Sequence, residues 1–440
     1  MQLYIFPFIL LVFDARADLV GEAPTCDDKE NRNCEWAQRA EMLEYTANAN
    51  PPMAEVPVRI FPASLHKSGP TRTIPLDLSE ALAIPYPATA PNLLASFLRI
   101  NAGDSLETSV EHATSQSLYV IRGSGSSVTR AGVIDWHAGD LFVLPYLGDA
   151  TPSVCNSSGA KNQCVKHSCG GFLQPSSPPN SGGALEEAGG GDGSCALYYV
   201  HDEPLLRYLG ARPVDERRFQ PALYPGAAMR QSVADIDPVD AATGQIRNRR
   251  GILLSNPDAP QTKTLTPTLW SLLNSIDAGA TQSPHRHNSV ALDLAVASGA
   301  TAAGRRAYTL LGRELDANGH ILDPVKVEWE DGAVFVTPPG WWHSHHNPGS
   351  DTAWVLPMQD AGLYTHQRTL DIRFVEEEAA RLKSGVNRGA TLGVQPSSEE
   401  GKEPSGVTDD KDEKGSRNGD GAPPLVAGTI MFGHNNPNAN

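Results

Sequence analysis

Three histidines in the C-terminal half of the chain have the type and spacing of a metal site. His285 and His287 are separated by one residue, and His343 lies further on in a segment rich in tryptophan and histidine. Residues i and i+2 of a strand point to the same face, so the first two imidazoles can aim together into a barrel. A third from a neighbouring strand completes a triad whose opposite side stays open to substrate and oxygen. The sequence therefore predicts one metal site at His285, His287 and His343.

The elements that must position these histidines are short strands. Glycine and proline together make 75 of 440 residues (40 + 35), a share that favours many turns. Apolar or alternating runs separated by glycine turns predict an all-β chain with few helices. In the first block we expect strands at 94–100, 117–122, 126–134, 141–146 and 196–200; in the second, at 267–277, 290–297, 307–313, 325–329, 333–337, 353–358 and 369–374.

The two blocks repeat one another. The segment 139–145 (GDLFVLP) matches 332–338 (GAVFVTP), each with a glycine turn, an apolar strand and a proline at the same interval. This internal repeat indicates two copies of one barrel unit, at 91–203 and 263–376.

The second block resembles the cupin superfamily. Gly279-x5-His285-x-His287 matches the first half of the cupin signature, and Gly332-x5-Pro338-x-Gly340-x2-His343-x3-Asn347 matches the second half. The resemblance implies two cupin (double-stranded β-helix, jelly-roll) barrels in one chain. The usual glutamate ligand is missing, because Ala291 and Leu292 occupy its positions.

This glutamate-free pattern is similar to the bicupins of the gentisate 1,2-dioxygenase group. The likeness extends to 337–339 (TPP), 342–347 (WHSHHN) and 199–206 (YVHDEPLL), and covers roughly 40–375 as architecture. It implies an Fe(II)-dependent, ring-cleaving dioxygenase that uses O2 on an anionic hydroxylated aromatic acid, in which His285, His287 and His343 are the catalytic ligands. Mn, Ni or Zn remain alternatives, because such sites accept several metals.

The chain departs from that group in two ways. The group usually carries its ligands in the first barrel, whereas here the intact set is in the second. Of the acidic pair that follows the group's asparagine, the first position is Pro357 and only Asp360 matches. In the first barrel only His112 matches a ligand and Gln116 replaces the glutamate, so we expect that barrel to be degenerate.

Six further residues are candidates to contact the ligands or the substrate. Asp293 shares the face of His287 by strand alternation, and His345 lies on the side of His343. Asn347 would fix a turn, Trp342 would wall the pocket or pack the core, and Tyr308 would donate to substrate or pack across strands. Asp360, which matches one acid of the group's acidic pair, is the sixth candidate.

Two other functions remain open. One is a different metal-dependent cupin enzyme, such as a lyase, decarboxylase or isomerase. The other is a secreted cupin that binds a metal or ligand without catalysis. The resemblance also implies a homo-oligomer, whereas the net charge of −16 without a basic stripe argues against nucleic-acid binding.

The N-terminus predicts secretion. Residues 3–13 form an apolar run of signal-peptide length, and Ala15 and Ala17 fit a cleavage site, so we expect a signal peptide at 1–17 and no membrane span after its removal. A cytoplasmic location is the alternative. Clustered cysteines and the sequon at Asn156 favour disulfides and glycosylation in an oxidising compartment. The disulfide candidates are Cys26, Cys34, Cys155, Cys164, Cys169 and Cys195.

The remaining segments connect or extend the barrels. We expect a helix at 35–49 within an N-terminal arm (18–90), and a flexible Cys/Gly/Ser-rich insertion at 153–194. A connecting region (204–262) begins with a short helix at 204–209, and another helix at 376–384 closes the second barrel. The polar tail, 385–440, cannot bury enough apolar surface to fold and is predicted to be disordered.

Overall fold

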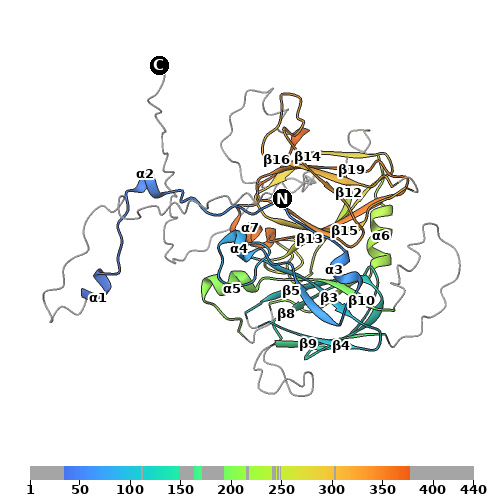
Figure 1. Cartoon of the computed structure of the whole chain (residues 1–440), viewed down its shortest axis with the longest axis horizontal. Coiled ribbons are helices and arrows are strands. Elements are labelled where there is room, and N and C mark those ends of the chain that lie inside the picture. The colour runs from blue at the N-terminus through green and yellow to red at the C-terminus, as the bar shows by residue number, and fades with distance from the viewer. Residues whose placement is uncertain are drawn as a thin grey trace, which may run out of the picture. The chain divides into compact units, whose positions relative to one another are not determined.

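The computed structural model describes residues 34–110, 112–147, 163–170, 193–214, 218–239, 244, 247, 249–301 and 304–376. The predicted signal peptide, the tail at 385–440 and almost all of the helix predicted at 376–384 lie outside these residues, as do Cys26, Cys155 and Asn156. The described part of the chain is mostly β (Figure 1), which confirms the predicted fold class.

The first barrel is built from two antiparallel sheets with the strand orders β11-β8-β5-β10-β3-β2 and β4-β9-β6-β7. Strands with buried faces on both sides, such as β5 and β10, lie at the centre of the larger sheet. The strands are β2 (Arg72–Pro75), β3 (Leu94–Ile100), β4 (Ser105–Val110), β5 (Ser115–Arg122), β6 (Ser124–Thr129), β7 (Gly132–His137), β8 (Leu141–Pro145), β9 (Gln163–Cys169), β10 (Cys195–His201) and β11 (Ala222–Tyr224).

The second barrel repeats this plan with the strand orders β1-β18-β15-β20-β13-β12 and β17-β16-β19-β14-β21. The seven strands predicted for this block are found with small shifts at their ends, and four further strands complete the sheets. In chain order, the strands of this barrel are β1 (Ile60–Phe61), β12 (Arg250–Leu254), β13 (Trp270–Ile276), β14 (Thr281–His287), β15 (Ala291–Ala297), β16 (Tyr308–Gly312), β17 (Val325–Glu328), β18 (Val334–Thr337), β19 (Trp342–His346), β20 (Ala353–Gln359) and β21 (Ile372–Phe374).

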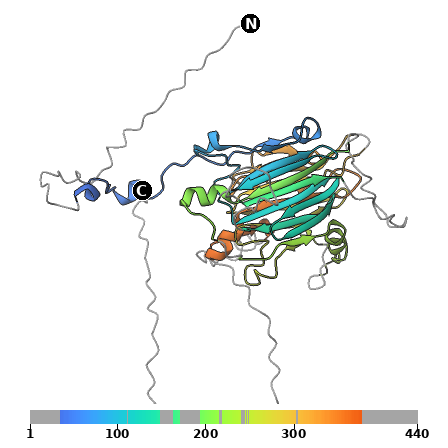
Figure 2. The same ribbon diagram turned by 90° about the horizontal axis from the view of Figure 1, so that it is seen from below.

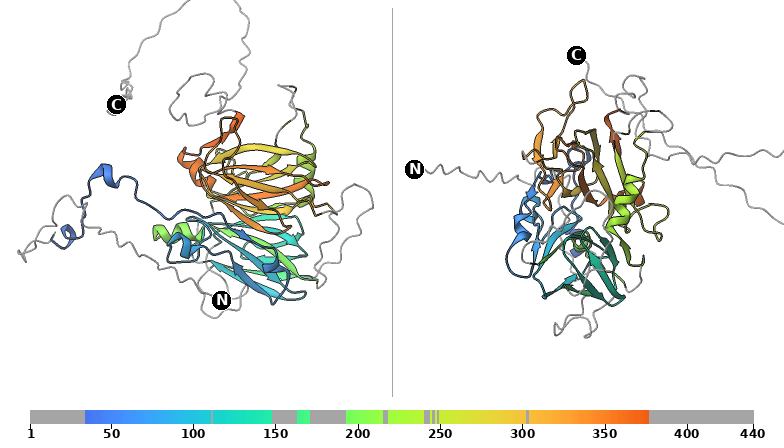
Figure 3. Two further views of the ribbon diagram at one scale, coloured as in Figure 1. Left: turned by 45° about the horizontal axis from the view of Figure 1, so that its top comes forward. Right: turned by 90° about the vertical axis from the view of Figure 1, so that its right-hand side faces the viewer.

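The large sheets of the two barrels face one another across a shared apolar core (Figure 3). Phe97 and Tyr198 of the first barrel belong to the same buried cluster as Leu292 and Val334 of the second. The Tyr198 hydroxyl donates a hydrogen bond to the Leu292 carbonyl at 3.1 Å. Each barrel keeps its own interior as well, formed by separate apolar clusters. Each large sheet is therefore buried on both faces, which explains its nearly continuous apolar strands.

The N-terminal arm joins both barrels. β1 pairs with β18 of the second barrel and β2 pairs with β3 of the first, with α3 (Ser64–Lys67) and α4 (Ser79–Leu82) nearby. The helix predicted at 35–49 is found as two single turns, α1 (Cys34–Ala37) and α2 (Tyr45–Asn48). Trp36 and Tyr45 are exposed, so no apolar face is buried to stabilise a longer helix.

Part of the segment 153–194 is a strand, which differs from the predicted insertion. Within it, β9 pairs with β4 and β6 and thereby completes the small sheet of the first barrel. Its Val165 and His167 are buried, and a disulfide joins Cys169 to Cys195 at the start of β10. Cys164 is disulfide-bonded as well. The Ser/Gly-rich composition of the surrounding sequence concealed this strand.

The connecting region also contributes to the sheets. After α5 (Glu203–Leu209), β11 extends the first barrel, and β12 extends the second after α6 (Gly226–Ala234). Figure 2, which turns the view by 90°, shows the strands of one sheet side by side. α7 (Ala361–Gln367) follows β20 just as α5 follows β10. Among the described residues, no helix has the length and apolar character that a membrane span requires.

Candidate metal centre

The three predicted ligand histidines converge in the second barrel. His285 and His287 lie on β14, and His343 lies on β19, directly opposite His285 in the strand register. One ligand atom from each residue lies within 4.8 Å of the others. The ring centroid of His285 is 4.0 Å from that of His343 and 6.1 Å from that of His287. These three side chains could hold a metal ion.

Backbone carbonyls orient two of the rings. The Nδ1 atom of His287 lies 2.8 Å from the Ser289 carbonyl, and that of His343 lies 3.1 Å from the Trp341 carbonyl. A carbonyl oxygen only accepts, so Nδ1 carries the proton in both rings and each Nε2 keeps its lone pair for a ligand bond. Such outer hydrogen bonds fix the ring orientation in metal sites.

Burial keeps the three imidazoles neutral. It lowers the pKa of His287 to about 4, although the hydrogen bond to Ser289 opposes this. Burial also lowers the pKa values of His285 and His343 well below the ordinary range, with a further contribution from neighbouring histidines. A neutral imidazole is the form that binds a metal, so the cluster fits a cation without having to lose protons.

An unsatisfied nitrogen supports the same fit. The Nδ1 atom of His285 is buried and has no hydrogen-bond partner. A buried polar atom without a partner is costly, and a bound metal ion would satisfy this one. Three imidazole nitrogens suit Fe, Ni or Zn better than Mg or Ca, which prefer oxygen ligands.

His345 lies next to the three histidines. Its ring centroid is 5.9 Å from that of His285 and 5.8 Å from that of His343. The Trp329 indole donates to Thr309 Oγ1 at 2.9 Å, and Thr309 Oγ1 lies 2.9 Å from His345 Nδ1. Thr309 Oγ1 therefore joins the Trp329 indole to the His345 imidazole. This contact holds the His345 ring in a fixed orientation beside the cluster.

The two predicted carboxylates are both buried, in different surroundings. Asp293 accepts a hydrogen bond from the Thr337 hydroxyl at 2.6 Å, and burial raises its pKa to about 7. It lies opposite Pro357 in the register, on the face of β15 that includes Ala295 of the interior cluster. Asp360 accepts from the Val290 amide at 3.1 Å and from Asn92 at 2.7 Å.

The other predicted residues are placed as follows. The Asn347 side chain bonds the carbonyls of Ile276 and Asp351 and accepts from the Gly349 amide, the turn role expected from sequence. Tyr308 and Trp342 do not join the cluster. Tyr308 stacks on His346 at 4.7 Å, and the Arg286 guanidinium lies over Trp342 at 5.2 Å. Tyr308, Trp342 and His346 are the strand neighbours of Thr309, His343 and His345. Because successive side chains of a strand point to opposite faces, they face away from the cluster.

Sequence reasoning missed two contributors. Arg249 precedes β12, stacks over Phe374 at 4.6 Å and donates to the Ser283 carbonyl; its charge helps to lower the pKa values of His285, His343 and His345. Gln359 accepts from Ser289 Oγ at 2.8 Å, and Ser289 also contacts His287. No motif marks Arg249, because it comes from a segment distant from the histidines in sequence.

The first barrel has no comparable triad among its described residues. His112 is partly buried, and its Nδ1 atom lies 2.8 Å from the Ala211 carbonyl. Gln116 points into the barrel interior and accepts a hydrogen bond from Tyr199. The metal-binding geometry is therefore confined to the second barrel, as far as the chain is described.

Comparisons with known proteins identify the architecture. No family model matches the chain, and no curated protein matches it. Salicylate 1,2-dioxygenase from Pseudaminobacter salicylatoxidans is similar in structure, with a TM-score of 0.50 and 12% identity over 76% of this chain and 93% of that one. A variant of that enzyme in complex with gentisate gives a TM-score of 0.51 and 12% identity, over 81% of this chain and 99% of that one. The chain therefore shares the two-barrel fold of these structures.

Proposed function

We propose that this protein is an Fe(II)-dependent dioxygenase that cleaves the ring of a hydroxylated aromatic acid of the gentisate or salicylate type. The observation that carries the proposal is the cluster of His285, His287 and His343 inside the second barrel. When bound, iron supplies a Lewis-acidic centre that brings substrate and O2 together and passes electrons between them. The fold shared with salicylate 1,2-dioxygenase supports this reading.

The surroundings of the cluster favour an anionic substrate. Three neutral imidazoles leave the full positive charge of a divalent cation uncompensated. Arg249 adds a positive charge that acts on His285 and His343. A substrate with a carboxylate beside a phenolic oxygen suits this site, because it is anionic and its two oxygen groups can bind the same metal ion. His345, whose Nδ1 atom lies 2.9 Å from Thr309 Oγ1, would donate a hydrogen bond from Nε2 to one of these oxygens and orient it during the reaction.

The buried setting would also exclude water from the reacting atoms. His287 and His343 are each 3% exposed, and His345 is 5% exposed. A water-poor site strengthens the attraction between an anionic substrate and the positive charges around it.

Oxygen uptake tests the proposal. Protein purified without oxygen and loaded with Fe(II) is assayed with gentisate, salicylate and 1-hydroxy-2-naphthoate, and metal content is measured in parallel. We expect oxygen consumption that depends on iron and on one of these acids. Substrate turnover under strict anaerobiosis would instead indicate a lyase, decarboxylase or isomerase. Metal binding without turnover of any acid would favour a binding protein.

The cellular location is proposed on separate grounds. The Cys169–Cys195 disulfide is compatible with secretion, because disulfides persist in oxidising compartments. We therefore propose that the protein is secreted. Mass spectrometry of the mature N-terminus from culture medium tests it, with Asp18 as the expected first residue.

A further inference from the structure

Gln359 is a buried amide whose side chain faces the interior of the second barrel. It is the last residue of β20 and is 4% exposed. On the same strand, Leu356 and Met358 belong to the core shared by the two barrels, whereas Val355 belongs to the interior cluster of the second barrel. Because successive side chains of a strand alternate between its two faces, Gln359 shares the interior face with Val355.

The oxygen of this amide is connected to the metal cluster. Ser289 Oγ donates a hydrogen bond to Gln359 Oε1 at 2.8 Å, and the same Oγ lies 3.3 Å from Nδ1 of His287. Ser289 is itself fully buried. The Gln359 amide is therefore only two polar contacts away from one of the three cluster histidines.

The nitrogen of the same amide has no acceptor in the protein. No residue in the described part of the chain accepts a hydrogen bond from Gln359 Nε2, which carries two N–H groups. A buried donor without an acceptor costs about 1–3 kcal/mol. An acceptor that arrives with a bound molecule would remove this cost.

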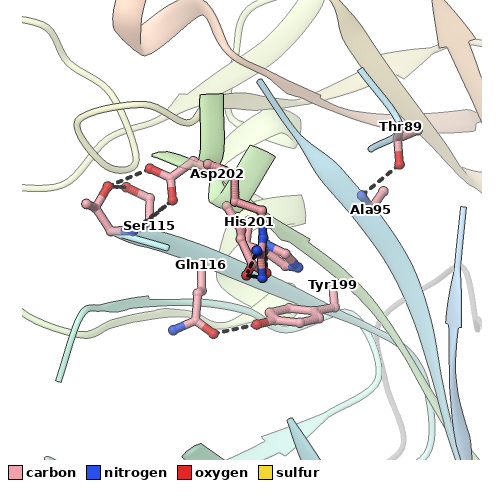
Figure 4. A network of polar contacts seen from close by, with 10 residues as sticks. Thr89, Ala95, Ser115, Gln116, Tyr199, His201 and Asp202 are labelled. Carbon is pink, nitrogen blue, oxygen red and sulfur yellow. Dashed lines mark hydrogen bonds and ion pairs between the residues drawn. The ribbon is translucent and has the colours of Figure 1, made fainter. Parts of the chain in front are cut away.

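The neighbouring strand supplies no such acceptor from its side chain. The register partner of Gln359 on β15 is Ala291, which presents only a methyl group. The corresponding pair in the first barrel is His201 and Gln116, and there Gln116 accepts a hydrogen bond from the Tyr199 hydroxyl (Figure 4). The second barrel thus has an amide opposite a methyl group where the first has two polar side chains.

The charges around the cluster favour a negatively charged acceptor. Among the described residues, no carboxylate joins the three histidines, so a bound cation keeps its charge. The positive charge of Arg249 acts on His285 and His343 as well. An anionic oxygen would be attracted by both charges and would make a charge-assisted hydrogen bond with an amide N–H, which is stronger than a neutral one.

We propose that Gln359 is a specificity-determining residue, which donates a hydrogen bond from Nε2 to an anionic carboxylate or phenolate oxygen of the substrate. This inference rests on the proposed function, because it assigns a binding residue to the acid that the metal cluster would take. A purely structural role, in which Gln359 holds Ser289 against His287, uses only the Oε1 atom. Substitutions that keep this oxygen therefore separate the two roles.

Anaerobic calorimetry of the iron-loaded protein with salicylate tests the proposal without turnover. Gln359→Glu keeps an acceptor for Ser289 but replaces the donor with an acid, and Gln359→Met has no donor at any pH. We expect each variant to bind salicylate at least about tenfold more weakly, roughly the value of one hydrogen bond to a charged group. Iron content should be unchanged in Gln359→Glu. Gln231→Glu, at an exposed position of α6, is the control and should bind salicylate as the unaltered protein does.

Three results would overturn the assignment of Gln359. These are full salicylate affinity in both folded variants, a parallel loss of iron and salicylate binding in Gln359→Glu, and no salicylate binding by the unaltered protein. Circular dichroism checks that the variants are folded. Failure of the proposed function looks different: weaker salicylate binding in both variants, together with no oxygen uptake by the unaltered protein, would reject the dioxygenase and leave the role of Gln359 standing.

Discussion

Asp202 and Asp360 occupy equivalent positions in the two barrels, and each accepts a hydrogen bond from the other barrel. Asp202, which follows β10, accepts from the Thr268 hydroxyl at 3.0 Å, and Asp360, which follows β20, accepts from Asn92 at 2.7 Å. Each also holds backbone amides at the start of a central strand of its own barrel: Ser115 for Asp202 and Val290 for Asp360. The two barrels are therefore joined by two equivalent sets of hydrogen bonds, one in each direction, in addition to their apolar core.

This relationship predicts a matched effect on stability. Asp360→Ala leaves the Val290 amide and the Asn92 side chain without an acceptor, so we expect the free energy of unfolding to fall by about 1–3 kcal/mol. Asp202→Ala should cost a similar amount for the same reason. Urea unfolding followed by tryptophan fluorescence measures both. Asp135→Ala, at an exposed position of β7, is the control, and an Asp360→Ala protein as stable as this control would contradict the role.

Removal of a cluster histidine should remove the metal. His285→Ala leaves two of three imidazoles, and we expect iron affinity to fall by more than about 100-fold, the upper range for losing even an outer partner of a ligand. Metal content by mass spectrometry after dialysis is the measurement. His320→Ala, which changes an exposed histidine, should retain full metal content. Equal metal content in the two variants would exclude His285 as a ligand.

His345 should matter for turnover rather than for metal binding. His345→Phe keeps an aromatic ring of similar size but removes the donor, so we expect kcat to fall by about 100-fold or more with metal content unchanged. Thr309→Val, which removes the hydrogen-bond partner of His345 Nδ1, should give a smaller loss in the same direction. Steady-state oxygen uptake at saturating substrate measures both. A His345→Phe protein with unchanged kcat but less iron would instead make His345 a ligand.

Arg249 should determine the preference for acids. Arg249→Gln removes the positive charge near His285 and His343, and we expect KM for an aromatic carboxylate to rise by about 10- to 100-fold, the value of a charge-assisted hydrogen bond. Binding of the corresponding neutral amide should change little. Arg286→Gln, on the opposite side of the ligand strand, is the matched control. Equal effects on acid and amide would mean that Arg249 acts through the structure of the barrel.

His66 should make stability depend on pH. Its Nε2–H donates to the Gly332 carbonyl and its Nδ1 accepts from Arg122, so this arrangement requires the neutral ring. Burial lowers its pKa to about 4 from 6.5. Because the unfolded state binds the proton more tightly, the stability contribution is complete above about pH 6.5 and is lost as pH falls toward 4. We expect a loss of about 2 kcal/mol between about pH 7 and pH 5.

Urea unfolding across this pH range measures the effect. His66→Gln keeps one donor and one acceptor but does not titrate, so its unfolding free energy should vary less with pH. His320→Gln should vary as the unaltered protein does. Identical pH profiles for His66→Gln and the unaltered protein would rule out His66 as the titrating group.

Local patterns were sufficient for much of the fold. Alternation and glycine turns located β15, β16, β18 and β20 to within a few residues, because strands buried on both faces have long apolar runs. The same approach failed for β9, whose neighbours are rich in serine and glycine, and for the segment 35–49. The helix-forming residues of 35–49 are not enough to make one continuous helix, because a helix of that length also needs an apolar face packed against the rest of the protein.

The sequence alone was sufficient to select His285, His287 and His343 as the residues of one metal site. Strand alternation and motif spacing identify them because both are properties of short segments. The sequence assigned roles to only some of the neighbouring candidates. It predicted a turn role for Asn347, but it did not decide whether Tyr308 donates to substrate or packs across strands. Tertiary structure decided which face of its strand each residue occupies. It alone brought Arg249 to the cluster and Asn92 to Asp360, because these contacts join residues far apart in the chain. Hydrogen bonds and burial across barrels depend on how the sheets pack, and no local pattern encodes that packing.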